Sequence, residues 1–582
     1  MPGICAAVSS GEVLSSLPKG SVSAVILREP GAAGLVHALG AKALISTPPV
    51  ILPEEFDAEL SSALKALDSG ADGVELCDLG LLRRLKSERP GTFLLAGPMA
   101  NVYNRDTLSV LLSEGVREVC PSIELDIQGL ADLCGSGAPV MATVYGPLPL
   151  SFGRASLPEQ AVVWPEAELR ASGRALVSSK PYDLYDDLPA LWAIGIRSFR
   201  IEDADAETVL RFKAALDAAA AGKPPPPRAG LAKGTNGYLR GSAGCSRSEV
   251  LGTPTGRIRL ARARSSISRA DPLPSRHGLP ALLAPAGNMD CMAAACANGA
   301  DGVYVGLKGW SLRPGVFEFD EEDLRRAVDA AGRAGAWVAA CVNISLLPGE
   351  EDAALEAVRT AKRCGCRAVI VGDLGLLSAA RAAFPDLPLH ASVQLGATNA
   401  EAAQFLHEHG ADVVVLSRSI ETLEELRAVR KKTAAPLEVF VHGDVCTFHD
   451  GKCHLTSYLR RERVVPGQGH GLASVVGCSN RGECTLACKQ PFKGGTFRRR
   501  DLERLSWVPE LVRMGIAILK IEGRQFGPDY VSMVTKAYRK ALDRSPEVNA
   551  LSELEGMREH LAQRDISYEF QRQAWLRGKT EQ

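Results

Sequence analysis

The chain has 582 residues, a formal net charge of −1, 46% hydrophobic residues and 23% charged residues. A single core stops growing at about 300 residues, so this length predicts two domains. No apolar run reaches the ~20 residues of a membrane span, and the near-zero charge offers no general attraction to nucleic-acid phosphates. We therefore expect a globular protein without a transmembrane segment or a strong nucleic-acid signal.

The N-terminal sequence MPGICAAVSSGEVL lacks a basic segment followed by an apolar one, so it is not expected to be a secretion signal. The expected location is cytoplasmic. The cytosol keeps thiols reduced, so the 15 cysteines are not expected to form a disulfide framework. They need an explanation in packing or in metal binding.

Residues 1–221 contain strings that recur in the second half of the chain. The matched strings are GADGVEL (70–76) with GADGVYV (299–305), CDLGLL (77–82) with GDLGLL (372–377), VYGPLPLSFGRASL (144–157) with VHGDVCTFHDGKCHL (441–455), and GIRSFRIE (195–202) with GIAILKIE (515–522). The first copy starts late and leaves room for about seven strands. It is therefore predicted to be an incomplete or borrowed barrel.

Residues 222–279 begin with GKPPPPRAG and are rich in Pro, Gly, Ser and Arg, a composition typical of a linker. The linker contains a basic tract, RIRLARARSSISR (257–269). Nucleic-acid contact is one interpretation of this tract, but its charge pattern favours a solvated linker.

Residues 280–545 contain eight short β-branched runs at regular intervals, separated mostly by segments rich in Ala, Glu, Arg and Leu. The runs are ALLAP (281–285), GVYVG (302–306), WVAACV (337–342), AVIVG (368–372), LHASV (389–393), VVVLS (413–417), LEVFVHG (437–443) and AILKIE (517–522). This alternation predicts a near-complete (β/α)8 barrel. The fold class is thus α/β with two related barrel-like domains, followed by a polar tail over 546–582.

Four cysteines lie between the last two predicted strands. Six residues separate Cys446 from Cys453, and three separate Cys484 from Cys488. Four thiolates suit a 4Fe-4S cluster or a structural zinc, although neither pair has the C-x2-C spacing usual for zinc. The spacing favours a metal centre over unligated cysteines and leaves both metals open.

The other cysteines have no paired spacing. Cys478 is a reserve ligand, because it lies just before the second pair. The remaining ten are expected to be structural thiols: Cys5, Cys77, Cys120, Cys134, Cys245, Cys291, Cys296, Cys341, Cys364 and Cys366.

The first copy lacks the cysteines of the second. Pro149 aligns with Cys446, Ala155 aligns with Cys453, and the segment that contains the other pair is an insertion present only in the second copy. We therefore expect one metal centre per chain. The first half is expected to shape an interface or to close the active site.

Several strings carry a resemblance to a known family. They are LLAPAGNMDCMAAACANGADGVYVGLK (282–308), ASVQLGATNAEAAQF (391–405), LEVFVHGDVCTFHDGKCHLTSYL (437–459), NRGECTLACKQPF (480–492) and KIEGRQFGPDYVSMVTKAYRKALD (520–543). They resemble the collagenase-like peptidase family U32 over 281–545. The second half is similar to the UbiU branch of this family. The first half is similar to the UbiV branch through DLGLL, MANVYNRDTLSVLL and VYGPLPLSFGRASL, so the chain resembles a fusion of the two.

The resemblance implies an oxygen-independent hydroxylase of ubiquinone biosynthesis that contains a 4Fe-4S cluster. It implies prephenate as the hydroxyl donor, an aromatic or quinone-precursor acceptor and a lipid-carrier accessory protein, whereas other family members hydroxylate RNA bases. The family's cluster ligands correspond to Cys446, Cys453, Cys484 and Cys488, which favours iron–sulfur over zinc. The UbiV branch has its own cluster, but this first half lacks the corresponding cysteines, which puts a two-cluster relay in doubt.

Active sites of such barrels lie at the C-terminal ends of the strands. Candidate catalytic residues there are Glu522, Arg524, Lys308, Arg418 and Asp373, and further polar candidates are Asn288, Asn343, Gln394 and His442. The three cations suit a dicarboxylate. Structural alternatives are a Glu522–Arg524 ion pair, a helix cap at Asp373, and simple packing of His442 instead of hydrogen bonding to the cluster.

Two other classes of function stay open. A peptidase needs a nucleophile–base pair or a catalytic metal, and the chain contains neither a Gly-x-Ser-x-Gly nor a His-Glu-x-x-His string. A non-catalytic cluster protein, acting as a redox sensor or scaffold, is the other alternative.

Overall fold

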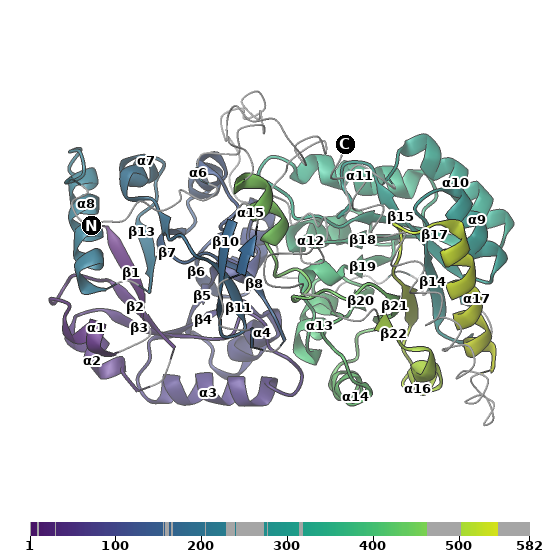
Figure 1. Cartoon of the computed structure of the whole chain (residues 1–582), viewed down its shortest axis with the longest axis horizontal. Helices are drawn as coiled ribbons and strands as arrows, with labels where there is room; N and C mark the ends of the chain where they lie inside the picture. The colour runs from purple at the N-terminus through teal and green to yellow at the C-terminus, as the bar shows by residue number, and fades with distance from the viewer. Residues whose placement is uncertain are drawn as a thin grey trace.

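The computed structural model describes residues 2–227, 278–462 and 502–544, except 9–10, 29–30, 155, 158–161, 165–166, 204 and 313–317, and also Leu239, Ala270 and 273–275. Two barrels lie side by side along the long axis of the molecule, the first in purple and blue and the second in teal, green and yellow (Figure 1). Most of the expected linker and the tail over 546–582 lie outside the described residues.

The second barrel is a closed ring of eight parallel strands, as the sequence predicts. They are β14 (Ala281–Pro285), β15 (Gly302–Leu307), β17 (Trp337–Val342), β18 (Ala368–Val371), β19 (Leu389–Ala391), β20 (Val413–Val415), β21 (Leu437–Gly443) and β23 (Ile518–Ile521). The ring closes because β14 pairs with both β15 and β23. Every residue of these strands is buried, since side chains fill the barrel inside and helices cover it outside.

Helices of the second barrel form its outer layer. They are α9 (Met289–Ala297), α10 (Glu321–Arg333), α11 (Glu351–Arg363), α12 (Leu374–Ala383), α13 (Ala400–Glu408), α14 (Leu423–Lys432), α16 (Val508–Arg513) and α17 (Pro528–Arg544). Two short strands lie at the rim: β16 (Glu318–Phe319) pairs with β15, and β22 (Leu502–Glu503) pairs antiparallel with β21. Helix α15 (Leu455–Glu462) follows the first cysteine pair.

The first barrel also has eight parallel strands, one more than the sequence suggested. They are β1 (Gly3–Val8), β2 (Ala24–Leu27), β3 (Lys42–Ser46), β4 (Gly73–Leu76), β5 (Phe93–Ala96), β6 (Val116–Val119), β7 (Met141–Gly146) and β13 (Ser198–Glu202). Only an isolated bridge between Val119 and Val140 joins β6 to β7.

Helices of the first barrel are α1 (Gly11–Ser15), α2 (Ala33–Ala38), α3 (Phe56–Asp68), α4 (Leu79–Glu88), α5 (Arg105–Ser113), α6 (Ile127–Gly135), α7 (Leu188–Ala193) and α8 (Ala206–Ala220). A small antiparallel sheet of β8 (Pro149–Phe152), β9 (Val162–Trp164), β10 (Ala167–Ser172) and β11 (Ala175–Ser178) is inserted between β7 and β13. A short strand, β12 (Tyr182–Asp183), then pairs with β7. This antiparallel sheet occupies the position in the chain that the cysteine segment occupies in the second half.

The two barrels meet through equivalent helices related by an approximate twofold axis. Helix α4 packs against α13, and α5 packs against α12. Helices α4 and α12 follow the fourth strand of each ring, and α5 and α13 follow the fifth. Such reciprocal contact is the geometry of an isologous dimer interface, here within one chain.

The glycine of each DLG motif permits this close approach. A Cβ added to Gly80 would lie 2.5 Å from Asn399 Oδ1, and one added to Gly375 would lie 2.4 Å from the Thr107 nitrogen. The DLG match is therefore a true repeat. The GADGV match does not relate equivalent positions. In the first barrel this string (70–76) leads into β4, the fourth strand of its ring, whereas in the second barrel (299–305) it leads into β15, the second strand.

A continuous cluster of buried apolar residues extends through both barrels and across the α4, α5, α12 and α13 contacts. In the part of the chain that the structure describes, no helix combines the length and apolarity needed to cross a bilayer.

Candidate metal centre and barrel mouth

Cys446 and Cys453 lie in the loop that follows β21, and both side chains are half-buried. The other two predicted ligands, Cys484 and Cys488, and the reserve ligand Cys478 lie outside the described residues. Among the residues that are described, no group of three or more His, Cys, Asp or Glu side chains is arranged to bind a metal. The structure therefore places half of the predicted ligand set.

Arg418, at the C-terminal end of β20, holds this loop together. Its Nε donates to Asp450 Oδ1 at 3.1 Å, and its Nη1 donates to the Asp444 carbonyl at 3.0 Å. Its Nη2 donates to Cys446 Sγ at 3.0 Å and to Asp450. A guanidinium beside a cysteine stabilises the thiolate, the form that binds iron.

Asp450 is fully buried and also accepts hydrogen bonds from the Arg418 nitrogen and from Ser417 Oγ. Burial alone raises the pKa of Asp450, but the charge and hydrogen bonds of Arg418 bring it below its ordinary value. The ionised pair fixes the loop, so Arg418 is occupied in positioning Cys446.

The first half covers the cysteine loop from the other side. The His449 nitrogen donates to the Phe152 carbonyl at 2.8 Å, and the His454 nitrogen donates to the Leu150 carbonyl at 2.7 Å. Cys453 forms a β-bridge with Ser151. The loop thus pairs with β8 like an added strand, so the first half covers one side of the loop. Helix α15, which follows the loop, lies beside β8 and β10 of the first half (Figure 1).

Glu522, at the end of β23, lies at the base of the same loop. Its Oε2 accepts from the Asp444 nitrogen at 3.1 Å, and Gln525 Nε2 donates to Asp444 Oδ2 at 2.8 Å. Gly443 has φ +113°, and a Cβ there would lie 2.7 Å from the Glu522 Cβ. Only glycine fits both constraints.

Arg524 is buried at the same rim and does not pair with Glu522. Its Nη2 donates to Ser311 Oγ at 2.7 Å, and its guanidinium lies 6.0 Å from the centre of the Tyr304 ring. Within the described residues its Nη1 is buried without a hydrogen-bond partner. An orphaned buried donor costs about 1–3 kcal/mol, more for a charged group, so this nitrogen is open to a hydrogen-bond acceptor.

A buried ionic triad lies inside the second barrel. Lys520 Nζ donates to Glu438 Oε1 at 2.6 Å, and His390 Nδ1 lies 2.7 Å from Glu438 Oε2. Burial by itself raises the pKa of Glu438, but Lys520 and His390 lower it to about 2. Sequence reasoning missed this triad, although charged residues within the apolar runs LEVFVHG and AILKIE are a signal for it.

Asp373 lies away from this rim, at the contact between the barrels. Its Oδ1 accepts from the Leu376 nitrogen and so caps α12, and Asn104 of the first half donates to its Oδ2 at 2.8 Å. Burial raises the pKa of Asp373. Asp373 therefore has the contacts of a helix cap that also faces the other barrel.

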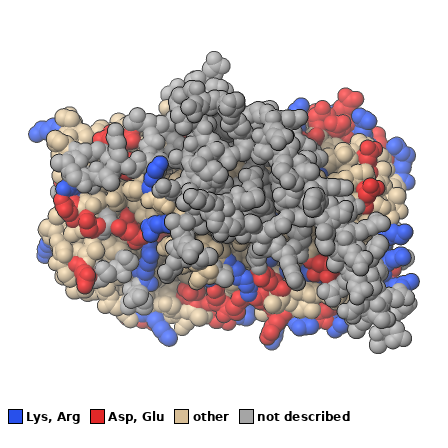
Figure 2. Space-filling model, viewed as in Figure 1, with Lys and Arg blue, Asp and Glu red and all other residues tan. Residues whose placement is uncertain are grey.

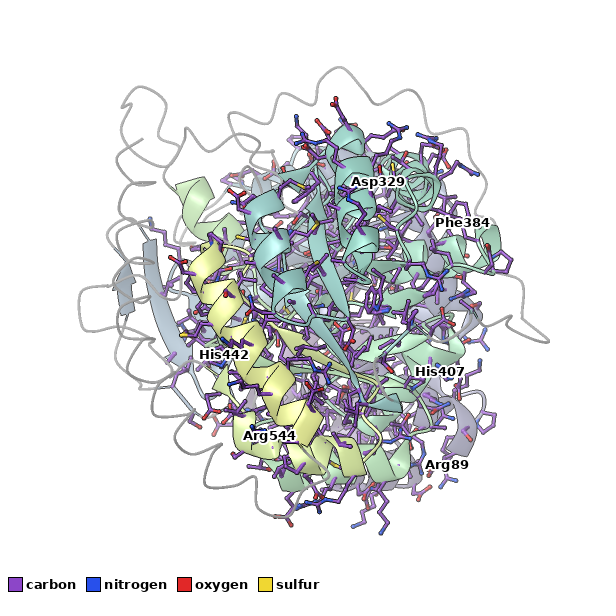
Figure 3. The ribbon with its side chains drawn as sticks, turned by 90° about the vertical axis from the view of Figure 1, so that its right-hand side faces the viewer. Arg89, Asp329, Phe384, His407, His442 and Arg544 are labelled. Atoms are coloured by element: carbon purple, nitrogen blue, oxygen red, sulfur yellow. The ribbon has the colours of Figure 1, made fainter. Side chains whose placement is uncertain are left out.

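The remaining predicted residues are dispersed. Lys308 is exposed at the rim, and Gln394 lies in a short helical turn where its carbonyl would contact a Cβ at Gly451. Asn288 caps α9, and Asn343 accepts from the Leu312 nitrogen. His442 lies beside α17 (Figure 3), 3.5 Å from the Tyr538 hydroxyl and with its ring near that of Tyr530.

The described cysteines that were expected to be structural are all buried or half-buried within the two barrels. Those that are buried are Cys5, Cys77, Cys120, Cys291, Cys341, Cys364 and Cys366, whereas Cys134 and Cys296 are half-buried. Burial raises the pKa of Cys77 to about 12 and that of Cys120 to about 11. Cys245 lies outside the described residues.

Fold and site together define a chain of two fused parallel α/β barrels, one of which carries a cysteine loop at its mouth. The model of peptidase family U32 matches residues 287–577, half of the chain, and the chain belongs to this family.

Curated relatives match part of the chain. The tRNA hydroxylation protein P1 of Bacillus subtilis is 29% identical over 282 residues, which are 45% of this chain and 63% of that protein. The 23S rRNA 5-hydroxycytidine C2501 synthase of Escherichia coli is 29% identical over 274 residues, 45% of this chain and 39% of that protein. The structure of the U32 peptidase Mk0906 aligns with 44% of this chain and 97% of its own, at 16% identity and a TM-score of 0.29.

Proposed function

We propose that this protein is an oxygen-independent hydroxylase in which Cys446, Cys453, Cys484 and Cys488 hold a 4Fe-4S cluster. The two described cysteines suit this group: both are half-buried in one loop, and a buried guanidinium donates to Cys446 Sγ. A cluster bound there supplies redox and Lewis-acid chemistry at the barrel mouth. Hydroxylation is also the activity named for the relatives from B. subtilis and E. coli.

Arg524 is the residue that we propose binds the substrate. Its unpartnered Nη1 is buried at the rim where Glu522 and Gln525 contact the base of the cysteine loop. A carboxylate that paired with this guanidinium would satisfy the donor and would be oriented by it. We propose prephenate as the carboxylate-bearing hydroxyl donor, with Lys308 at the rim as a second cation.

The proposed acceptor is a small aromatic ring, a precursor of ubiquinone. A net charge of −1 supports a small acceptor over a polyanion. On the face drawn in Figure 2, acidic and basic side chains are intermingled in the described part. A lipid-carrier accessory protein would deliver such an acceptor.

Hydroxylation of an RNA base is the second candidate, because the named relatives act on tRNA and rRNA. Nucleosides and quinones from a deletion strain, compared by mass spectrometry, separate the two acceptors. A missing hydroxyl on a quinone supports the first candidate, and a missing hydroxyl on a nucleoside supports the second.

Anaerobic purification tests the metal centre. We expect a brown protein with a broad absorption band near about 400 nm, typical of cluster thiolates, that is lost in Cys446→Ala and Cys484→Ala. Cys134→Ala is the matched control, because Cys134 is half-buried but remote in the chain from the loop. A colourless protein with stoichiometric zinc would refute the cluster. Turnover with prephenate in the two ligand variants would exclude it from the chemistry.

A further inference from the structure

The mouth of the first barrel contains a cavity of about 500 Å³. Residues at the C-terminal ends of β1, β2, β3, β4 and β13 form its floor, and β8 and β11 of the antiparallel sheet form a wall. This volume is within the range of small-molecule sites, and the C-terminal mouth is where barrel enzymes bind ligands. The half without cluster cysteines therefore retains the shape of a binding site.

A buried ionic group forms the floor of this cavity. Arg200 donates from Nη2 to Glu75 Oε2 at 3.3 Å, from Nη1 to Glu75 Oε1, and from Nε to Glu202 Oε1 at 2.7 Å. Ser46 Oγ donates to Glu75 Oε2 at 3.0 Å. Two carboxylates surround one guanidinium, so the charge of Arg200 is already compensated and one negative charge remains.

The other charged side chains of the lining leave its net charge negative. At the rim, Arg28 pairs with Asp203 at 3.2 Å, and Glu59 faces the cavity from α3. The described lining thus contains four carboxylates and two guanidinium groups. Apolar side chains complete the walls: Pro48, Pro49, Pro98, Met99, Pro147 and Phe152. Such a cavity disfavours anions and suits an apolar ring with hydrogen-bond donors.

The two mouths therefore differ in the balance of their charged groups. Lys520 and Glu522 of the second barrel align with Arg200 and Glu202, but the second mouth adds Arg524 with a buried, unpaired donor. In the first mouth, the guanidinium of Arg200 donates its hydrogen bonds to the carboxylates of Glu75 and Glu202.

We infer that the first barrel binds, in this cavity, a small uncharged or cationic organic molecule that carries hydroxyl or amino groups on an apolar ring. The inference rests on the cavity and its charges and is independent of the hydroxylase proposal.

Residues that line the first-barrel cavity form hydrogen bonds with the cysteine loop. Lys452 Nζ donates to the carbonyls of Met99 at 2.5 Å and Cys77 at 3.2 Å, and the Phe152 carbonyl accepts from His449. Cys77, Met99 and Phe152 all line the cavity. A ligand that restrains these walls also restrains the segment between Cys446 and Cys453.

Three probes with the same ring and different charges test the inference on the full chain with Arg524→Met, which removes the proposed anion site of the second mouth: tyramine (cationic), tyrosol (neutral) and 4-hydroxyphenylacetate (anionic). We expect titration calorimetry to give dissociation constants on the order of 1 mM for tyramine and tyrosol, ordinary for ligands of this size. The anion should bind at least about tenfold more weakly, since it meets the net negative lining.

Variants locate the binding site. Ser62→Trp, at an exposed position that lines the cavity, should abolish binding, whereas Lys65→Trp on the same helix but outside the lining should not. Glu202→Gln should weaken tyramine about tenfold and tyrosol much less, because only tyramine loses a charge partner. Absence of tyramine and tyrosol binding, equal binding of the anion, or full binding in a folded Ser62→Trp variant overturns the inference.

Discussion

Asn104 of the first barrel donates from Nδ2 to Oδ2 of Asp373 in the second barrel, at 2.8 Å. The twofold-related pair does the same at 3.0 Å, from Asn399 to Asp78. Each asparagine also caps its own helix, and so does each aspartate. The contact between the halves is thus built from four capped helix N-termini whose side chains are mutually bonded and buried.

Loss of either asparagine should destabilise the protein by a similar amount. Asn104→Ala and Asn399→Ala each remove a helix cap and leave a buried carboxylate short of a donor, so we expect a loss of about 2–4 kcal/mol in the free energy of unfolding. Urea unfolding measures it. Thr422→Ala removes the cap of α14, an exposed helix start, and should cost only about 1 kcal/mol. An equal loss in all three variants would contradict the proposed role of the interface.

Arg418→Met should release the cysteine loop. The substitution removes the donor to Cys446 and leaves Asp450 buried without its countercharge, which costs about 3–5 kcal/mol. We expect a lower melting temperature and little bound iron, whereas Arg418→Met with Asp450→Asn should recover stability but not iron. Arg427→Met, at an exposed arginine, is the control. Full iron content in Arg418→Met would exclude a role for Arg418 at the centre.

Arg524→Met should weaken binding of prephenate without loss of stability. The guanidinium has a buried, unpaired donor, so its removal is expected to leave the melting temperature unchanged or higher. Affinity should fall about 100-fold, the effect of losing one buried charge-assisted contact. Calorimetry measures both quantities. Lys308→Met, at the exposed rim, should reduce affinity by much less, and an unchanged dissociation constant in Arg524→Met would remove Arg524 from the site.

Glu438 should make stability fall in acid. Its pKa is about 2 in the folded protein and 4.5 ordinarily, so the ionised carboxylate contributes stability above about pH 4.5 that is lost as the pH falls towards about 2. The contribution is on the order of 3 kcal/mol at most. Glu438→Gln with Lys520→Met should show a shallower loss over this pH range in thermal unfolding. Glu424→Gln, at an exposed carboxylate, should behave like the unchanged protein.

Much of the fold was readable from local patterns. The eight runs of the second barrel coincide with its eight strands, because buried parallel strands are apolar throughout and the helices between them have their own composition. The repeat was readable from three of its four matched strings. The match at 70–76 and 299–305 was misleading, because a helix-to-strand turn uses similar residues wherever it occurs.

Candidate residues at strand ends were only partly predictable. A position at the end of a strand predicts that a residue lies at the mouth of the barrel. It does not predict which side chain that residue contacts. Arg418 meets Asp450 and Cys446, whereas Asp373 meets Asn104, which lies far away in the sequence.

The sequence by itself determined two related α/β barrels and a cysteine segment in only one of them, since periodicity and spacing are local properties of a chain. Its motifs determined membership of a known family. Only the tertiary structure decided that the first half closes over the cysteine loop, that Arg418 positions Cys446 while Arg524 keeps a buried donor unpaired, and that the two mouths differ in charge. These features depend on which side chains meet in the folded chain. Packing of the two barrels brings the first half onto the cysteine loop, and closure of the second barrel brings Arg418 and Arg524 to their partners.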